Sequence, residues 1–170
     1  ALTMNELERS RELVESLTAA YGSLEQPNYS FMEKRYKSLL RQPFITDAMS
    51  RFFVKNDTDL NDHASLHLRV LHNDGSMMVC LSFVDNWAML FRLEKENPVY
   101  TEIIEPSLSP VLSAEREMMQ LLEQHGFKLI TRREAAAPVE MSLFNTDRSE
   151  ARIYHAIIAD DGVVPRVLLD

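Results

Sequence analysis

The sequence predicts an α+β fold in which N-terminal helices pack on a mainly antiparallel β-sheet. Apolar residues recur at helical spacing over residues 1–54, alternation with a hairpin signal follows over 66–93, and a further helical pattern occupies about 110–125. A chain of 170 residues is long enough for one filled core. We therefore expect a single domain over residues 1–170, made of a helical segment (1–54) and a sheet-centred body (66–170).

The first helix has a defined start and one apolar stripe. Thr3 and Glu6 have the spacing of a capping box, in which a hydroxyl and a carboxylate each accept a backbone amide that has no intrahelical partner. The expected stripe consists of Leu7, Val14, Leu17, Tyr21 and Leu24. It would either dock on the body of the fold, which we favour, or pair with the same helix of a second copy to form a homodimer.

Two further helices are expected before the sheet. Residues 30–33 read Ser-Phe-Met-Glu, a second capping box that would open a short helix. Pro43 interrupts this helix, because the residue before a proline is pushed out of the helical region. Helical spacing resumes at Phe44 and continues to residue 54.

A three-stranded antiparallel meander is predicted over residues 66–93. Apolar and polar residues alternate from 66 to 70, as in a strand with one buried face. Asn73-Asp74-Gly75 is typical of a type I′ hairpin turn, which needs positive φ at its centre. The return strand over 77–84 then reverses at Asp85-Asn86 into the third strand, 87–93.

The C-terminal part is expected to add strands and one helix. Residues 99–104 read as a strand, and Ser109 can cap a helix that has Pro110 at its first position and runs to about residue 125. Residues 127–131 and 152–159 are expected as further strands, and Asp160-Asp161-Gly162 as a turn.

Charge and cysteine content narrow the classes of partner and the compartment. The net charge is −8, with 26 acidic against 18 basic residues, so we expect no binding to nucleic acid or to anionic membrane. The longest apolar runs, such as 77–81, are too short to cross a bilayer. A lone Cys80 excludes an internal disulfide, and no signal-peptide pattern is visible at the start, so a cytoplasmic location is predicted.

Common cofactor and catalytic motifs are absent from the sequence. The four glycines stand far apart, so no glycine-rich loop can wrap a phosphate, and neither H-E-x-x-H nor G-x-S-x-G occurs. The run from Asp57 to Asp62 resembles the start of a calcium loop. However, Asp62 replaces the required glycine, and Leu68 stands where a bidentate glutamate belongs. We therefore expect no cofactor and no metal.

Three side chains belong to residue types that often take part in catalysis. His67 is expected as an exposed histidine on a strand, and Cys80 as a buried residue that packs like a small hydrophobe. Strand periodicity puts His155 in an apolar row, as a core or interface histidine. The sequence leaves open whether any of the three has a chemical role.

The expected function is that of a non-catalytic cytoplasmic protein-binding module, such as a toxin-neutralising immunity protein or a dedicated chaperone. The excess of acid either serves solubility or forms a face that suits a basic protein partner. The candidate partner-binding residues lie in two loops, and they are Asp57, Asp59, Asp62, Asp160 and Asp161.

The alternative class is a small-molecule sensor, or an enzyme whose pocket is assembled from dispersed residues. A deep pocket that holds His67, His155 or Cys80 would favour this alternative. A flat acidic face with exposed aromatic residues would favour the protein-binding module.

Overall fold

The computed structural model describes residues 2–94 and 99–169, and its class is α+β, as the sequence predicts. Its helices are α1 (Met4–Tyr21), α2 (Phe31–Leu40), α3 (Pro43–Arg51), α4 (Ser113–Gln124), α5 (Arg132–Ala136), α6 (Ile153–Ile157) and the short 3-10 turn η1 (Arg166–Leu168). Its strands are β1 (Phe53–Asn56), β2 (Ser65–His72), β3 (Gly75–Ser82), β4 (Trp87–Leu93), β5 (Tyr100–Ile104) and β6 (Lys128–Leu129). In the described residues, no helix has the length and apolar character needed to span a bilayer.

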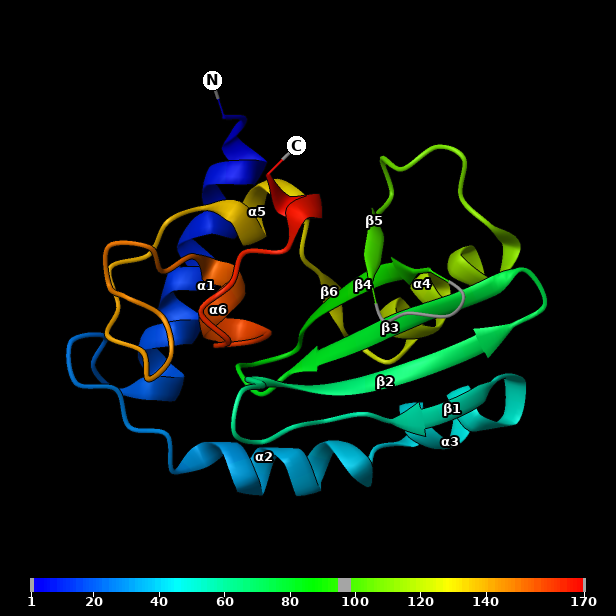
Figure 1. Cartoon of the computed structure of the whole chain (residues 1–170), viewed down its shortest axis with the longest axis horizontal. Coiled ribbons are helices and arrows are strands. Elements are labelled where there is room, and N and C mark those ends of the chain that lie inside the picture. Colours follow the sequence, from blue (N-terminus) through cyan, green and yellow to red (C-terminus); the bar gives the residue numbers. More distant parts are fainter. Residues whose placement is uncertain (1, 95–98, 170) are drawn as a thin grey trace.

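The sheet is an antiparallel meander with one short parallel addition (Figure 1). Its strand order is β1-β2-β3-β4-β5, and β6 pairs in parallel with the start of β4. The predicted meander over 66–93 is therefore confirmed, with Leu66 opposite Leu81 and Met78 opposite Phe91.

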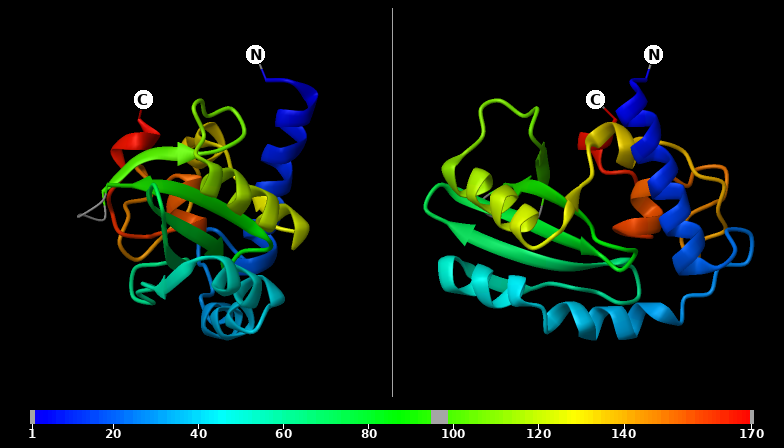
Figure 2. Two further views of the ribbon diagram at one scale, coloured as in Figure 1. Left: turned by 90° about the vertical axis from the view of Figure 1, so that its right-hand side faces the viewer. Right: turned by 180° about the vertical axis from the view of Figure 1, so that it is seen from behind.

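Helices cover both faces of the sheet, which explains why β3 and β4 are apolar on both sides. The face that bears Cys80 and Met89 packs against α1, α5 and α6, which gather at one end of the molecule (Figure 1). The opposite face bears Val79 and Leu90 and packs against α2, α3 and α4. In the right-hand view of Figure 2, α4 lies across this second face. The described residues thus form two apolar cores, one on each face of the sheet.

The start of α1 is capped as predicted. The Thr3 hydroxyl accepts from the Glu6 amide over 3.1 Å, and the Thr3 amide donates to the Glu6 carboxylate over 2.9 Å. The buried stripe differs from the prediction, because Leu7 and Val14 are both 46% exposed. Docking of α1 on the body is shown, and pairing of α1 with a second copy stays a prediction.

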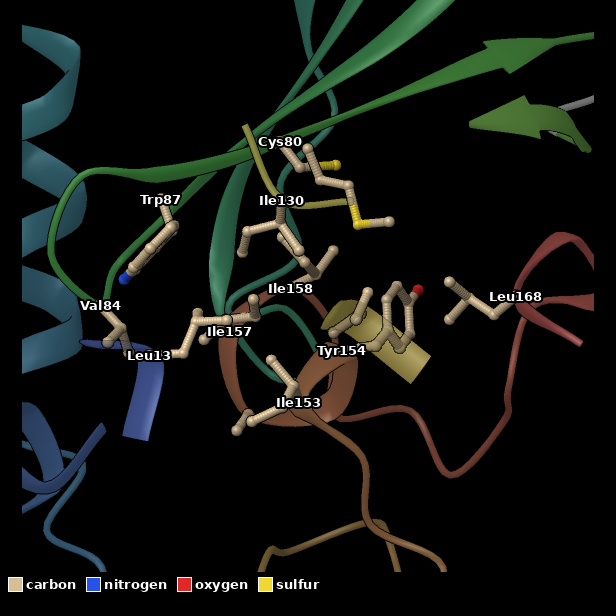
Figure 3. Close-up of a cluster of buried hydrophobic side chains, with 14 of the residues drawn as sticks. Leu13, Cys80, Val84, Trp87, Ile130, Ile153, Tyr154, Ile157, Ile158 and Leu168 are labelled. Atoms are coloured by element: carbon tan, nitrogen blue, oxygen red, sulfur yellow. The ribbon is translucent and has the colours of Figure 1, made fainter. Parts of the chain in front are cut away.

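The residues that α1 buries are Leu13, Leu17 and Tyr21, spaced four positions apart. Figure 3 shows Leu13 in one cluster with Trp87 and Ile157. Because α1 meets both the sheet and α6, its line of contact follows this four-residue row rather than the row of Leu7 and Val14.

Polar contacts fix α1 in the same place. Arg9 donates to both carboxylate oxygens of Glu134, over 2.8 and 3.0 Å, and also to the carbonyl of Leu129 over 2.6 Å. The indole N–H of Trp87 donates to the Ser16 hydroxyl over 3.1 Å. These bonds join α1 to β4, β6 and α5.

The first hairpin forms where it was predicted, with a different turn. His72 pairs with Gly75, so Asn73 and Asp74 form a two-residue loop. Gly75 has φ of +151°, a positive value as expected, whereas Asn73 and Asp74 do not have positive φ. The turn is therefore not type I′, and the glycine is needed at the start of β3 instead of at the turn centre.

One predicted cap and two predicted element boundaries are wrong, although α2 begins at Phe31 as predicted. The side chain of Ser30 makes no capping bond, because Ser30 itself has helical backbone angles. The helical segment ends at Arg51, and residues 53–56 instead form the edge strand β1, which pairs with β2. The helix α4 begins at Ser113 rather than after Ser109, because the carboxylate of Glu115 accepts from the Leu112 amide over 2.9 Å and fixes the first turn there.

The predicted strand over 152–159 is a short helix, α6. Residues 153–158 are all buried, so their apolar pattern has no period that separates a strand from a helix. His155 lies in the first turn of this helix, where its Nδ1 accepts from the Arg152 amide over 3.0 Å. The predicted strand over 127–131 is confirmed only at Lys128–Leu129.

Candidate functional site

The two acidic loops that the sequence treats as alternatives lie side by side. The Asp160 amide donates to the Asp62 carbonyl over 2.7 Å, and the Ala64 amide donates to the Ile158 carbonyl over 2.9 Å. Between these bonds, His63 and Ala159 form an isolated antiparallel bridge. Backbone pairing thus brings both loops into one acidic surface, called here the acidic junction, which contains residues 57–62 and 160–161.

Two of the five candidate carboxylates are occupied by contacts within the fold. Asp57 is half-buried, and its carboxylate lies 2.7 Å from the Arg69 guanidinium and 3.8 Å from the Lys55 ammonium. Asp160 is buried, and its oxygens accept from the amides of residues 144 and 145 and from the Thr146 hydroxyl. Asp57 therefore carries a compensated charge, and Asp160 shapes the neighbouring loop.

The other three carboxylates give the acidic junction its charge. Asp59 accepts from the Asn61 amide, and Asp161 accepts from the Val163 amide, in short local turns. Within the described ranges, no Lys or Arg forms an ion pair with Asp59, Asp62 or Asp161. Burial raises the pKa of the Asp161 carboxyl above its ordinary value.

A pocket of about 420 Å³ opens beside the acidic junction, and it is called here the junction pocket. It lies where the end of α1, the start of α2, the β1–β2 loop and the loop before α6 meet. Its apolar lining consists of Tyr21, Tyr29, Met32, Leu60, Ala64, Leu143 and Phe144. Its polar lining consists of Glu33, Asn61, Asp62, His63 and Asp160. This volume is within the range of ligand-binding pockets.

An exposed aromatic residue stands at this pocket. Phe144 is 78% exposed, and its ring centroid lies 4.4 Å from that of Tyr29. The Tyr29 hydroxyl donates to the Ser142 carbonyl over 3.1 Å, and the ring meets Tyr21 edge-on. Burial, followed by the charge of Asp160, raises the pKa of Tyr29 to about 12, so its hydroxyl stays protonated at neutral pH.

Hydrogen bonds to Asp160 and Gly162 hold the loop that carries Phe144. The side chain of Asn145 donates to the Asp160 carbonyl over 2.9 Å and lies 3.4 Å from the carboxylate of Asp62. Gly162 donates its amide to the Thr146 hydroxyl, and it has φ of +74°. A β-carbon at Gly162 would lie 2.6 Å from the Asn145 carbonyl oxygen, so only glycine fits this close approach.

Two histidines stack next to the junction pocket, and the expectation that His67 is exposed is wrong. His67 is 2% exposed, because both faces of β2 are covered, and its ring lies 3.6 Å from the ring of His63. Burial, with the neighbouring His63 ring, lowers the pKa of His67 to about 3. Its Nδ1 contacts Ser65, whereas its Nε2 has no hydrogen-bond partner among the described residues. His67 is therefore neutral at physiological pH.

His63 lines the junction pocket in the neutral form. Its Nδ1 accepts from the Asp59 amide over 2.9 Å, which places the ring proton on Nε2. Burial lowers the pKa of His63 below its ordinary value. Sequence reasoning did not bring the rings of His63 and His67 together, because residues four apart on an extended strand lie about 13 Å from each other. They meet because His63 precedes β2, in the loop.

Cys80 is held as a thiol, and both ring nitrogens of His155 make contacts within the fold. Cys80 is fully buried, as predicted, and burial raises the pKa of its thiol, so no thiolate is available at neutral pH. His155 is buried on α6, where Nδ1 accepts from the Arg152 amide and Nε2 contacts the Val163 carbonyl over 2.9 Å. Neither residue lines the junction pocket, but His155 lines a separate pocket of about 570 Å³ with Arg152 and Gly162.

The predicted site residues did not include four that line the junction pocket, namely Tyr29, Leu60, His63 and Phe144. An apolar pair, Leu143-Phe144, within a polar stretch was the available sequence signal for the last of them. In the part of the chain that the structure describes, no three His, Cys, Asp or Glu side chains lie together as metal ligands would. Comparison of the chain with family models, with curated proteins and with solved structures finds no match in any of the three.

Proposed function

We propose that this chain is a non-catalytic protein-binding module that contacts a basic partner through the acidic junction. The observation that carries the proposal is the placement of Asp59, Asp62 and Asp161 on one surface with the exposed ring of Phe144. Uncompensated carboxylates accelerate the approach of a basic partner, and an exposed aromatic ring on a rigid loop supplies binding energy at short range. A toxin-neutralising immunity protein or a dedicated chaperone in the cytoplasm is the kind of protein that we propose.

The state of the candidate reactive groups favours this proposal over catalysis. His67 and Cys80 are buried and do not line the junction pocket, and His155, also buried, lines a separate pocket of about 570 Å³ with Arg152 and Gly162, away from the acidic lining. The junction pocket itself favours the second candidate, a small-molecule sensor, because its volume suits a small ligand. The two candidates differ in what should contact Phe144 in the cell: a protein in the first, and a metabolite in the second.

Site-specific photo-crosslinking tests the proposal directly. A benzoylphenylalanine at position 144 replaces one exposed aromatic ring with another, and the matched control places it at Phe53, an exposed ring on the remote edge strand β1. Irradiation in the source cells should give a discrete covalent protein adduct from position 144 and none from position 53. Replacing both Asp59 and Asp62 by Lys in the labelled chain should abolish the adduct.

The outcomes divide the two candidates. A protein adduct at position 144 that depends on Asp59 and Asp62 supports the binding module. Absence of any adduct specific to position 144 overturns it, and purification of the chain with a bound metabolite would then favour the sensor.

A further inference from the structure

We propose that the junction pocket receives the side chain of an arginine of the partner, as the anchor of the complex. This inference rests on the proposed function, because it names the group by which a basic protein is recognised. It depends on the cavity and its aromatic wall as well as on the acidic residues around it.

The charges of the pocket lining have one sign. Glu33, Asp62 and Asp160 line the pocket, and no Lys or Arg among the described residues does so. His63 adds no positive charge, since burial keeps its ring neutral at physiological pH. A ligand that enters this space meets a negative potential with low-dielectric walls, which favours a cation.

The apolar part of the lining selects among cations. Tyr29 and Phe144 present ring surfaces, and Met32, Leu60 and Leu143 line the remaining apolar wall. A planar guanidinium stacks on aromatic faces, and the three methylenes of arginine can lie along apolar surface. A metal ion or a strongly hydrated small cation would not use this wall.

Asp62 is the carboxylate of this lining that is best placed to bind the guanidinium. The oxygens of Asp160 already accept from the loop that it holds, and Glu33 is an exposed side chain 3.3 Å from the ammonium of Lys37, whereas Asp62 is half-buried. Asp62 has only a long contact of 3.4 Å, from the amide of Asn145 to Oδ1, among the described residues. Asp62 is therefore the residue to which the arginine donates, and the rigid loop at 144–146 holds the aromatic wall in place beforehand.

Tripeptides that differ only in the central side chain test the inference. The probes are acetylated and amidated Gly-Arg-Gly, its citrulline analogue, which has the same shape without the charge, and Gly-Lys-Gly. Titration into the isotopically labelled full chain, followed by amide NMR shifts, reports both affinity and location. We expect shifts at residues 60–64 and 143–146, with the arginine probe bound about tenfold tighter than the citrulline probe, and lysine between them.

Variants assign the binding to the named groups. Asp62→Asn keeps the shape of the side chain and should remove the preference for arginine over citrulline. Phe144→Ala should weaken the arginine probe about fivefold or more. The controls Asp74→Asn and Phe53→Ala, both remote from the pocket, should leave the affinity unchanged. The spectra themselves show whether each variant is folded, and Asp62→Asn decides the matter if Phe144→Ala is perturbed.

The results separate this inference from the proposed function. Equal affinity for the arginine and citrulline probes, or NMR shifts elsewhere on the chain, would overturn the inference that the junction pocket receives an arginine. A partner photo-crosslinked at position 144 would still support the proposed protein-binding function. Binding of the arginine probe without any crosslinked protein would identify a site for a free guanidinium compound and overturn both.

Discussion

The imidazole rings of His63 and His67 lie face to face, with centroids 3.6 Å apart and planes inclined by 11°. Two stacked rings this close can both be accommodated only while they are uncharged, because burial penalises the charged form and a second positive charge would repel the first. A proton on His63, at the edge of the junction pocket, therefore disfavours a proton on the buried ring of His67.

Stability should fall on acidification because of His67. The pKa of His67 is about 3 in the folded chain and 6.5 for an unperturbed histidine. Between pH 3 and pH 6.5 the unfolded chain therefore binds more protons than the folded chain. The contribution of His67 is fully present above about pH 6.5 and is lost as the pH falls towards 3. The expected slope is up to about 1.4 kcal/mol per pH unit.

Urea unfolding of the wild type and of His67→Gln between pH 7 and pH 4 measures this slope. Glutamine preserves a hydrogen-bonding group near Ser65 and does not titrate, so the stability of the variant should depend less on pH. Parallel stability curves would contradict the prediction, as would an NMR titration of the His67 ring near pH 6.5.

The ion pair between Arg9 and Glu134 should contribute measurably to stability. The Glu134 side chain is only 10% exposed, and the guanidinium donates to both of its oxygens. A double-mutant cycle with alanine at both positions should give a coupling energy of about 1–2 kcal/mol. The exposed pair of Glu33 and Lys37 provides the control, for which we expect about 0.5 kcal/mol or less. Equal coupling in the two cycles would show that Arg9 does not anchor α1.

Two glycine variants separate backbone strain from collision. Gly22 and Gly162 have φ of +78° and +74°, and a β-carbon at Gly22 meets nothing within 4 Å. Gly22→Ala should therefore cost about 1–3 kcal/mol, the penalty of holding an alanine at φ of +78° and ψ of −58°, a backbone conformation that L residues rarely adopt. Gly162→Ala should cost at least about 1 kcal/mol more, because the carbonyl of Asn145 must move. Denaturant midpoints check the stabilities, and amide shifts at residues 143–146 check the movement.

Charge reversal at the acidic junction should slow association with the partner. Asp59→Lys and Asp62→Lys remove uncompensated negative charge, whereas Asp74→Lys alters the remote β2–β3 turn. Opposite charges chiefly raise the rate of encounter, so association should slow steeply with salt while dissociation changes less. Stopped-flow measurement at two ionic strengths with the crosslinked partner tests this, and association that is independent of salt would refute charge matching.

The fold class could be predicted because its signals are local. The alternation in β2, the glycine of the first hairpin and the cap formed by Thr3 and Glu6 each depend on residues close together in the chain. The strands β1 and β6 have four and two residues, and α6 has five, so they carry little pattern of their own. These elements exist because a neighbouring strand or core covers them, and that information is not local.

The acidic residues of the candidate site could be selected from the sequence, but their arrangement in space could not. Counting carboxylates selected both acidic loops, but the backbone pairing of Asp62 with Asp160 is invisible in the sequence. The same holds for the contacts that occupy Asp57 and for the exposure of Phe144. Charge can be read along a chain, whereas its compensation by a distant group depends on the fold.

The docking of α1 has a consequence for the order in which the chain is made. The Tyr21 hydroxyl donates to the carbonyl of Ala156, a partner 135 positions later, and Leu13 and Leu17 pack in the same cluster as α6. During translation the first helix therefore leaves the ribosome long before the surface that covers its apolar side exists. A nascent chain that ends before α6 keeps that side open to chaperones and to other nascent chains, so α1 completes its packing only after α6 has been synthesised.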